Sequence, residues 1–126
     1  LIDDAESETA SNTRLVLTIA LSYGSRAEIA TAAQRIASQV SDGTLAIEDI
    51  DEHVLGQNLY TANMPDPDLL IRTSGEQRIS NFLLWQLAYS EFIFVDKLWP
   101  DFGQTDLQDA VQEYHRRERR YGATGG

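Results

Sequence analysis

Two short, nearly continuous apolar runs constrain the fold of this chain more than any other feature. They are Val16–Leu21 and Leu69–Ile71. A strand with one face in water alternates apolar and polar residues, whereas a strand covered on both faces does not alternate. Both runs therefore predict buried strands of a parallel sheet with flanking helices, which is an α/β fold.

A helix between these two strands is predicted by its spacing and by the signals at its ends. Apolar residues recur three and four positions apart from about residue 26 to residue 41, and Gly43 follows as a stop. Ser25 and Glu28 have the spacing of a capping box, in which each side chain accepts a hydrogen bond from the other residue's backbone amide. A further short helix is expected near 51–57.

The second half of the chain predicts more elements of the same α/β pattern. The prolines of 64–68 exclude helix there and lead into the strand at 69–71. The later expected elements are a polar loop over 72–80, a buried helix over 81–88, a strand over 92–95, a packed turn over 98–102 and a helix from Thr105, capped with Gln108, to about Arg120 before Gly122.

Composition excludes several classes of function. The chain has 126 residues, enough for one domain, with 10 Lys and Arg against 20 Asp and Glu and a formal net charge of -10. Binding to nucleic acid or to an anionic membrane through overall charge needs the opposite sign, so we expect no nucleic-acid partner. The chain has no Cys, which excludes disulfides, thiolate zinc sites and a Cys nucleophile. An anionic ligand must be held by a local cluster.

The polar loop at 72–80 is the best candidate for such a cluster. Ligands of open parallel sheets bind outside the carboxyl ends of the strands, where this loop begins. Arg72 and Arg78 offer planar sets of donors that suit phosphate oxygens, and Ser80 adds a hydroxyl. The alternative is that both arginines pair with Glu76 and other carboxylates.

Glu91 is the candidate metal ligand. It lies between two apolar segments, where an ionised side chain is costly unless it is paired or binds a cation. Magnesium usually binds through one or two carboxylates together with substrate phosphates. The alternative is an ordinary surface carboxylate. His53 and His115 have no partner at metal-ligand spacing, and we interpret them as surface residues.

The longest motifs together resemble the cis-prenyltransferases, and most closely the bacterial undecaprenyl diphosphate synthases. They are DLLIRTSGEQRISNFLLWQ at 68–86, AYSE at 88–91, LWPDF at 98–102, YGSR at 23–26 and RERRYG at 117–122. The resemblance implies that residues 1–126 are the C-terminal part of a single domain of that fold, with the N-terminal half absent. The start at Leu1, inside an acidic segment, likewise indicates a fragment or a processed chain.

This resemblance implies a prenyl transfer in which isopentenyl diphosphate condenses with an allylic diphosphate, such as farnesyl diphosphate, to give a cis polyprenyl diphosphate. Isopentenyl diphosphate would be bound by Arg72, Arg78, Ile79 and Ser80, and Mg²⁺ by Glu91. In a homodimer, Arg120 and Gly122 would reach a diphosphate site across the interface. The enzyme would be cytoplasmic or peripheral at the inner face of the membrane, to which its product passes.

One family motif has no counterpart here. The Asp-Gly-Asn-Gly segment of the family carries the catalytic Asp, and nothing like it occurs in this sequence. We therefore assign no catalytic residue within 1–126 and expect this chain alone to be inactive. Two alternatives remain, a noncatalytic partner subunit of a heteromeric cis-prenyltransferase and an unrelated phosphate-binding module. The intact loop from Arg72 to Ser80 favours the enzyme.

Overall fold

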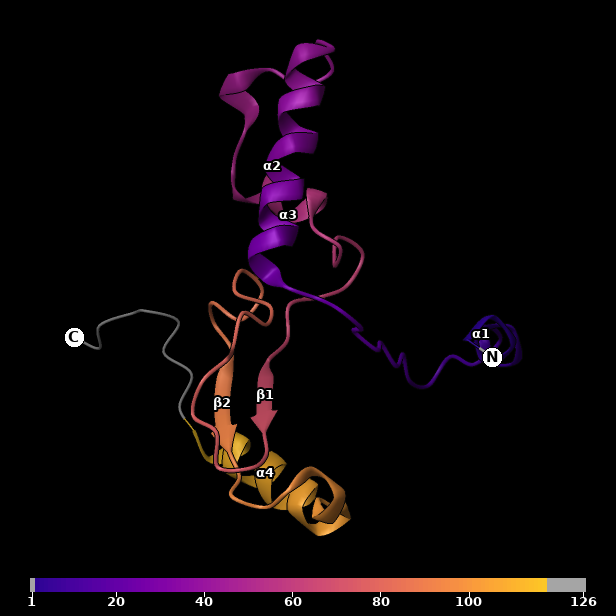
Figure 1. The fold of residues 1–126 in the computed structure, drawn as a ribbon, viewed down its shortest axis with the longest axis vertical. Helices are drawn as coiled ribbons and strands as arrows, with labels where there is room; N and C mark the ends of the chain where they lie inside the picture. Colours follow the sequence, from indigo (N-terminus) through magenta and orange to yellow (C-terminus); the bar gives the residue numbers. More distant parts are fainter. Residues whose placement is uncertain (1, 118–126) are drawn as a thin grey trace, which may run out of the picture.

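The computed structural model describes residues 2–117 (Figure 1). Two parallel strands form its sheet, with two helices beyond one end of the strands and one helix at the other end. The elements in chain order are α1 Ile2–Thr9, α2 Ser25–Ser41, η1 Ile47–Asp49, α3 Glu52–Asn58, β1 Leu69–Arg72, β2 Glu91–Phe94, η2 Trp99–Asp101 and α4 Gln104–Arg116. In Figure 1, α2 and α3 lie beyond one end of the strands and α4 lies at the other. None of the helices within residues 2–117 is long and apolar enough to cross a membrane.

The sheet confirms two of the predicted strands. β1 and β2 pair in parallel, with Leu69 opposite Glu91 and Arg72 opposite Phe94. β2 begins one residue before the predicted strand at 92–95. Ile93 is the buried residue of β2, and β1 is half-buried along its length.

The helical end of the molecule also follows the predictions. α2 covers the expected range of 26–41, and α3 covers the short helix expected near 51–57. The two helices pack together, and Ala32, Ile36 and Leu59 are buried there. The Arg35 guanidinium adds a hydrogen bond of 3.0 Å to the carbonyl of Asn58 at the end of α3.

The predicted capping box of α2 is wrong. Ser25 and Glu28 are both completely buried, and their side chains accept hydrogen bonds from distant parts of the chain. The Leu84 amide donates to Ser25 Oγ at 2.9 Å, and the Tyr60 amide donates to Glu28 Oε1 at 2.8 Å. Tertiary partners have therefore replaced the local ones that the spacing suggested.

The helix predicted over 81–88 is also wrong, because the chain forms a series of turns there. Ser80, Asn81 and Leu83 have φ values of 48°, 64° and 45°, which lie in the left-handed region. A right-handed helix requires negative φ at every residue, so these residues exclude it. The same segment instead provides the partners of the first turn of α2.

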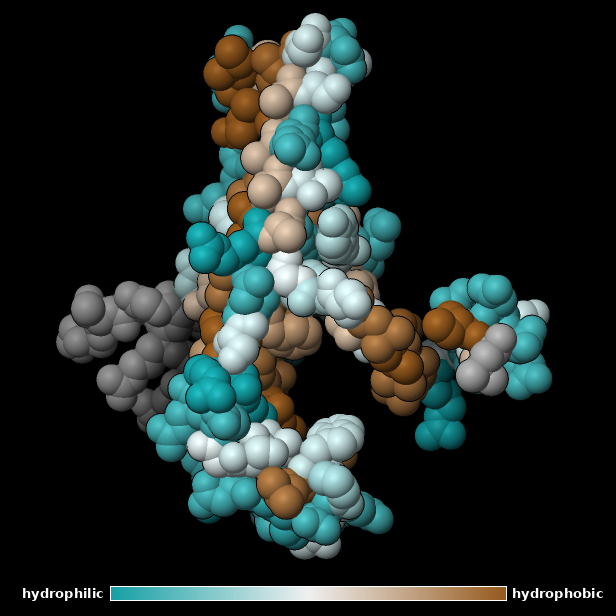
Figure 2. Space-filling model, viewed as in Figure 1, coloured by the Kyte–Doolittle hydropathy of each residue, from teal (hydrophilic) through white to brown (hydrophobic). Residues whose placement is uncertain are grey.

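The strand predicted over 16–21 does not form. The segment is extended without strand pairing, and its apolar side chains are exposed, with Val16 at 84% and Leu17 at 76%. A strand needs a hydrogen-bonded neighbour, and the one sheet within residues 2–117 consists of β1 and β2. Figure 2 shows the apolar atoms of this segment on the stretch that joins α1 to α2.

The last part of the described chain departs in detail from the predictions. α4 is capped at Gly103, whose amide donates to Asp106 Oδ2 at 2.8 Å, so the expected box of Thr105 and Gln108 is wrong. The helix ends at Arg116 rather than near Arg120. The predicted turn is confirmed as η2, where the Trp99 and Phe102 rings stack with centroids 6.1 Å apart. Its packing against the rest of the chain was wrong, because Leu98 and Trp99 are 58% and 72% exposed.

Candidate diphosphate-binding site

Arg72 ends β1, and its side chain holds the following loop against the end of the strand. Its Nη1 donates to the carbonyl oxygen of Arg78 and, at 3.3 Å, to Ser80 Oγ. These partners are neutral oxygens, so the Arg72 guanidinium keeps its positive charge uncompensated by them. The structure thus brings Arg72 and Ser80 together as the sequence predicted, with the backbone of Arg78 between them.

The base of this loop is fixed to the chain that leaves β2. The amide of Ser74 donates to the carbonyl of Lys97 at 2.8 Å, and the amide of Gly75 donates to that of Val95 at 3.0 Å. Ser74 and Gly75 have φ values of 69° and 66°. A Cβ at Gly75 would also lie 3.3 Å from Asp96 Oδ1, so both the backbone and the space favour glycine.

The Arg78 side chain pairs with Glu76, which was the alternative to anion binding for this arginine. Arg78 Nη1 lies 2.5 Å from Glu76 Oε2, and the two side chains are 66% and 37% exposed. An exposed ion pair of this kind contributes only about 0–1 kcal/mol, so an incoming anion can replace it at small cost. Arg78 is therefore paired but available.

Ile79 contributes to an apolar cavity beside the loop. The cavity has a volume of about 370 Å³ and extends along β1 to Arg72, with Phe82, Leu83 and Leu87 from the following turns in its wall. A guanidinium at the edge of an apolar cavity suits a ligand with an anionic group and a hydrocarbon part.

Glu91 lies apart from these residues. It opens β2 opposite Leu69, three register positions before the pairing partner of Arg72, which is about 10 Å along a parallel strand. Its Oε2 accepts a hydrogen bond of 3.0 Å from Arg117 Nη1, and its side chain is 28% exposed. Glu91 is therefore a paired and partly exposed carboxylate at the start of β2, which is compatible with the surface-carboxylate alternative as well as with a metal role.

Arg117 is a residue of this region that the sequence analysis did not single out. Its guanidinium also donates to the carbonyl of Phe92 at 2.9 Å and to Glu113 Oε1 at 3.3 Å. The hydrogen bond to Glu91 is the main cause that raises the pKa of Arg117 above its usual value. The motif RERRYG at 117–122 contains Arg117, but it gave no signal of a pairing with Glu91.

No group of three or more His, Cys, Asp or Glu side chains that could hold a metal occurs within residues 2–117. A metal bound by Glu91 would therefore take its other ligands from substrate, from water or from elsewhere. The predicted site residues Arg120 and Gly122 lie outside the described residues.

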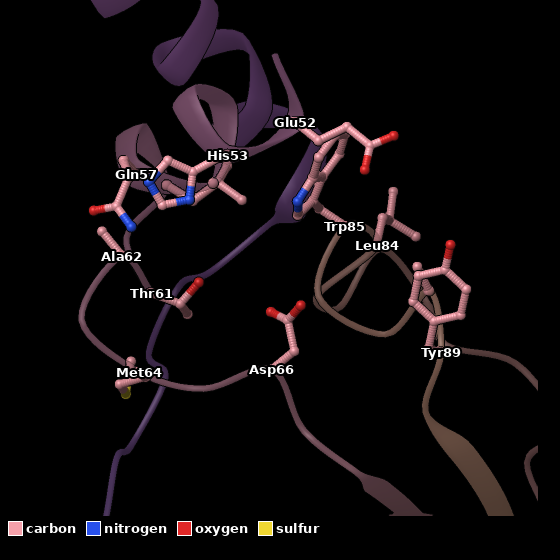
Figure 3. Close-up of a pocket in the computed structure, with 13 residues that line it drawn as sticks. Glu52, His53, Gln57, Thr61, Ala62, Met64, Asp66, Leu84, Trp85 and Tyr89 are labelled. Carbon is pink, nitrogen blue, oxygen red and sulfur yellow. The ribbon is translucent and has the colours of Figure 1, made fainter. Parts of the chain in front are cut away.

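A second cavity, of about 580 Å³, lies between α3 and the turns before β2 (Figure 3). His53 and Trp85 are among the residues that line it, and the carboxylate of Asp66 points into it in Figure 3. None of the predicted site residues that the structure describes takes part. For this part of the chain the sequence predicted a short helix near 51–57 and gave no signal of a cavity.

Comparison with known proteins shows to which family the chain is similar. The family model of undecaprenyl diphosphate synthase matches residues 1–122. Isoprenyl transferase of Geobacter sulfurreducens is 53% identical over 98% of this chain and 50% of its own length. A synthase of Micrococcus luteus, named ditrans,polycis-undecaprenyl-diphosphate synthase ((2E,6E)-farnesyl-diphosphate specific), is 50% identical over 94% of this chain and 48% of its own. The chain spans about half the length of these relatives.

Solved structures give the same result. Lavandulyl diphosphate synthase from Lavandula x intermedia, in complex with dimethylallyl diphosphate, is 47% identical with a TM-score of 0.91 over 97% of this chain and 52% of that one. A probable undecaprenyl diphosphate synthase from Campylobacter jejuni is 35% identical with a TM-score of 0.79 over 97% of this chain and 54% of that one. The predicted α/β fold is confirmed. Since the family model matches nearly the whole sequence, the chain belongs to the undecaprenyl diphosphate synthase family of prenyltransferases.

Proposed function

We propose that the complete protein condenses isopentenyl diphosphate with an allylic diphosphate, in repeated steps, to give a cis polyprenyl diphosphate. Family membership supports this activity, as do the relatives that are named isoprenyl transferases. The M. luteus relative is named for farnesyl diphosphate, which favours that allylic substrate here.

The arrangement around Arg72 is the observation that carries the proposal. Arg72 and Ser80 face each other across 3.3 Å, and Arg78 lies on the same loop with only an exposed partner. Two guanidinium groups and a hydroxyl supply the charge and the donors that a diphosphate needs. Each hydrogen bond to a charged group contributes roughly 1.5–3 kcal/mol, so this set can provide much of the affinity for a micromolar ligand.

The chain's part in the reaction is to bind and orient isopentenyl diphosphate. A terminal carbon of isopentenyl diphosphate bonds to C1 of the allylic substrate, the C1–O bond breaks, its electron pair leaves with the diphosphate, and a proton is lost from the isopentenyl unit. Arg72, Arg78 and Ser80 would hold the isopentenyl diphosphate by its phosphates, with Ile79 beside its hydrocarbon part. Holding two reactants in register lowers the entropic part of the barrier.

Glu91 fits a magnesium ion that takes most of its ligands from substrate. It is a single, partly exposed carboxylate, and one or two carboxylates with phosphate oxygens are typical of protein-bound magnesium. Bound Mg²⁺ would neutralise negative charge that develops on the leaving diphosphate. Arg117 donates a hydrogen bond to Oε2 of Glu91. It would therefore either compete with the ion for that oxygen or hold the carboxylate in position while the ion binds.

Three further features belong to the same proposal. Residues 1–126 form the C-terminal part of one domain, and the catalytic Asp lies in an N-terminal part outside this sequence. The enzyme is a homodimer in which Arg120 and Gly122 reach a diphosphate site across the interface. It works in the cytoplasm or at the inner face of the membrane, and its product passes into the membrane.

The test is an incorporation assay with the complete protein. Radiolabelled isopentenyl diphosphate, unlabelled farnesyl diphosphate and Mg²⁺ should give a labelled product that extracts into organic solvent, and a chelator should abolish it. A complete protein that binds neither diphosphate would contradict the proposal. A protein that binds no substrate but activates a separate catalytic chain would show the noncatalytic partner subunit instead.

A further inference from the structure

The N-terminus of α2 is capped by a residue far away in the sequence. Gly24 occupies the N-cap position and has no side chain to offer. Asn81 takes that role twice, because its carbonyl oxygen accepts from the Ser25 amide at 2.9 Å and its Oδ1 accepts from the Arg26 amide at 2.9 Å. Free amides at a helix start need such acceptors.

Asn81 approaches α2 so closely that a Cβ at Gly24 would have to displace its side-chain amide. A Cβ placed on Gly24 would lie 2.9 Å from Asn81 Nδ2, a distance that real Cβ contacts essentially never show. The φ of Gly24 is -151°, which any residue can adopt, so the constraint comes from space rather than from the backbone. The side chain of Asn81 is thus held between the α2 amides and Gly24.

This contact also fixes the backbone at the end of the polar loop of residues 72–80, which we call the diphosphate loop. Ser80 and Asn81 are consecutive residues in the left-handed region, at φ 48° and 64°. Non-glycine residues rarely adopt this region, although Asn does so more readily than most. A pair of such residues persists only where the surroundings hold it, and the surroundings here include the two hydrogen bonds to α2.

Ser80 connects this contact to the proposed ligand. Its Oγ is the hydroxyl that accepts from Arg72, and its carbonyl carbon is bonded directly to the nitrogen of Asn81. A rotation at Asn81 would therefore turn Ser80 and change its distance from the Arg72 guanidinium.

We infer that Asn81 is a positioning residue for isopentenyl diphosphate, which sets the place of Ser80 relative to Arg72 by capping α2 from outside the helix. The inference rests on the proposed function, and Asn81 is not one of the proposed ligand-binding residues. It makes α2 part of the support of the diphosphate loop, even though the helix contributes none of the proposed ligands.

The test uses the complete enzyme and separate Michaelis constants for the two substrates. Asn81→Gly keeps a residue that tolerates positive φ but removes the Oδ1 acceptor. We expect it to raise KM for isopentenyl diphosphate about tenfold, the effect of roughly one lost hydrogen bond, and to leave KM for farnesyl diphosphate within about twofold. Asn81→Asp keeps the acceptor and should stay within about threefold of the wild type for both substrates.

Asp51→Ala is the matched control for a merely structural role. Asp51 caps α3 in the same way, since its Oδ1 accepts from the Val54 amide at 2.8 Å, but it lies away from the diphosphate loop. Its loss should lower the melting temperature without changing either KM. If Asn81→Gly does not fold, Gly24→Ala disturbs the same contact from the α2 side, and we expect a rise of about threefold in KM for isopentenyl diphosphate.

An unchanged KM for isopentenyl diphosphate in Asn81→Gly or Gly24→Ala, in an enzyme whose wild type is active, would overturn this inference and leave the proposed function standing. Equal increases for both substrates, or an Asn81→Asp as impaired as Asn81→Gly, would overturn it as well. A wild-type enzyme that does not use isopentenyl diphosphate would overturn the proposed function and the inference together.

Discussion

The hydroxyl of Tyr23 donates a hydrogen bond of 2.5 Å to Oε2 of Glu28, a carboxylate with no exposed surface. The other donors to Glu28 within residues 2–117 are the Tyr60 amide at 2.8 Å and Gln86 Nε2 at 3.3 and 3.4 Å. A buried carboxylate is costly without such partners, so these neutral donors replace a cation. Burial, and then the hydrogen bond to Glu28, raise the pKa of Tyr23, which keeps its proton on the phenol.

Glu28→Ala should destabilise the protein severely. It would leave the Tyr23 hydroxyl, the Tyr60 amide and Gln86 Nε2 without their acceptor, and we expect a loss of about 3 kcal/mol or more in the free energy of unfolding. Denaturant unfolding measures this loss. Glu48→Ala, at an exposed carboxylate, is the control and should stay within about 0.5 kcal/mol. A small effect of Glu28→Ala would show that water satisfies these donors.

Arg72→Ala and Arg78→Ala should weaken binding of isopentenyl diphosphate more than binding of the allylic substrate. We expect KM for isopentenyl diphosphate to rise about tenfold or more in each variant of the complete enzyme. The larger effect should come from Arg72, because it also holds the Arg78 carbonyl and Ser80. Arg14→Ala, at an exposed arginine outside the loop, should change neither constant. Equal losses for both substrates would indicate damage to the fold instead.

Glu91→Gln should raise the Mg²⁺ concentration that gives half-maximal activity and lower the turnover number. The neutral amide keeps the size of the side chain but attracts a cation far less than a carboxylate does. Glu113→Gln is the matched control, because Glu113 also accepts a hydrogen bond from Arg117, at 3.3 Å, but has no proposed metal role. Magnesium titration of both variants in the complete enzyme separates the two carboxylates. Identical titration curves would remove Glu91 from the metal site.

The ion pair of Asp106 with Lys97 should make stability depend on pH in the acid range. The hydrogen bond from Lys97 Nζ at 2.6 Å, followed by that from the Gly103 amide, lowers the pKa of Asp106 below its ordinary value of 3.8. A lowered pKa contributes stability that is present above 3.8 and is lost as the pH falls through the pKa of the folded state.

An NMR titration of the Asp106 carboxyl carbon checks this directly. The midpoint should lie below 3.8 in the wild type and move toward 3.8 in Lys97→Met. Lys97→Met should also lower the free energy of unfolding at pH 7, and the difference from the wild type should disappear once Asp106 is protonated. A midpoint that Lys97→Met leaves in place would assign the shift to the Gly103 amide alone.

Residues 1–126 alone should show no prenyl transfer and should self-associate. No residue here matches the catalytic Asp of the family, and the apolar side chains of 15–21 are exposed, with Leu15 at 79% and Leu21 at 73%. Sedimentation should show species larger than a monomer, and Leu17→Lys with Ile19→Lys should reduce them. Leu107→Lys, at a half-exposed leucine of α4, is the control. A monodisperse monomer that elongates farnesyl diphosphate would contradict both parts.

Elements with local signals were predictable from the sequence, and elements defined by distant contacts were not. α2 and β2 follow from apolar spacing and from short apolar runs, which depend on few other residues. The turns of 81–88 could not be predicted, because the left-handed conformation of Asn81 is favoured by its bonds to α2. The spacing of Ser25 and Glu28 was misleading for the same reason, since both side chains accept hydrogen bonds from residues that are distant in the sequence.

The same holds for the candidate site, whose local features were predictable and whose distant contacts were not. The residue types of the loop predicted that Arg72 and Ser80 would serve one anion, and the fold brings them together. Glu91 begins β2 and pairs with Arg117, which lies 26 positions later, directly after α4. No local pattern in the sequence predicts this pair. Segment 16–21 has the composition of a buried strand but forms none, because it lacks a hydrogen-bonded neighbour within residues 2–117.

The cap that Asn81 places on α2 limits how far the diphosphate loop can be treated as a portable module. Residues 72–80 read as a self-contained motif, yet the geometry of their last member depends on a helix turn that begins 48 residues before Arg72, at Gly24. A transplant of the loop alone into another parallel sheet would carry the arginines without the support that orients the serine. The unit that can be moved is therefore discontinuous, and a design that borrows it must take the first turn of α2 as well.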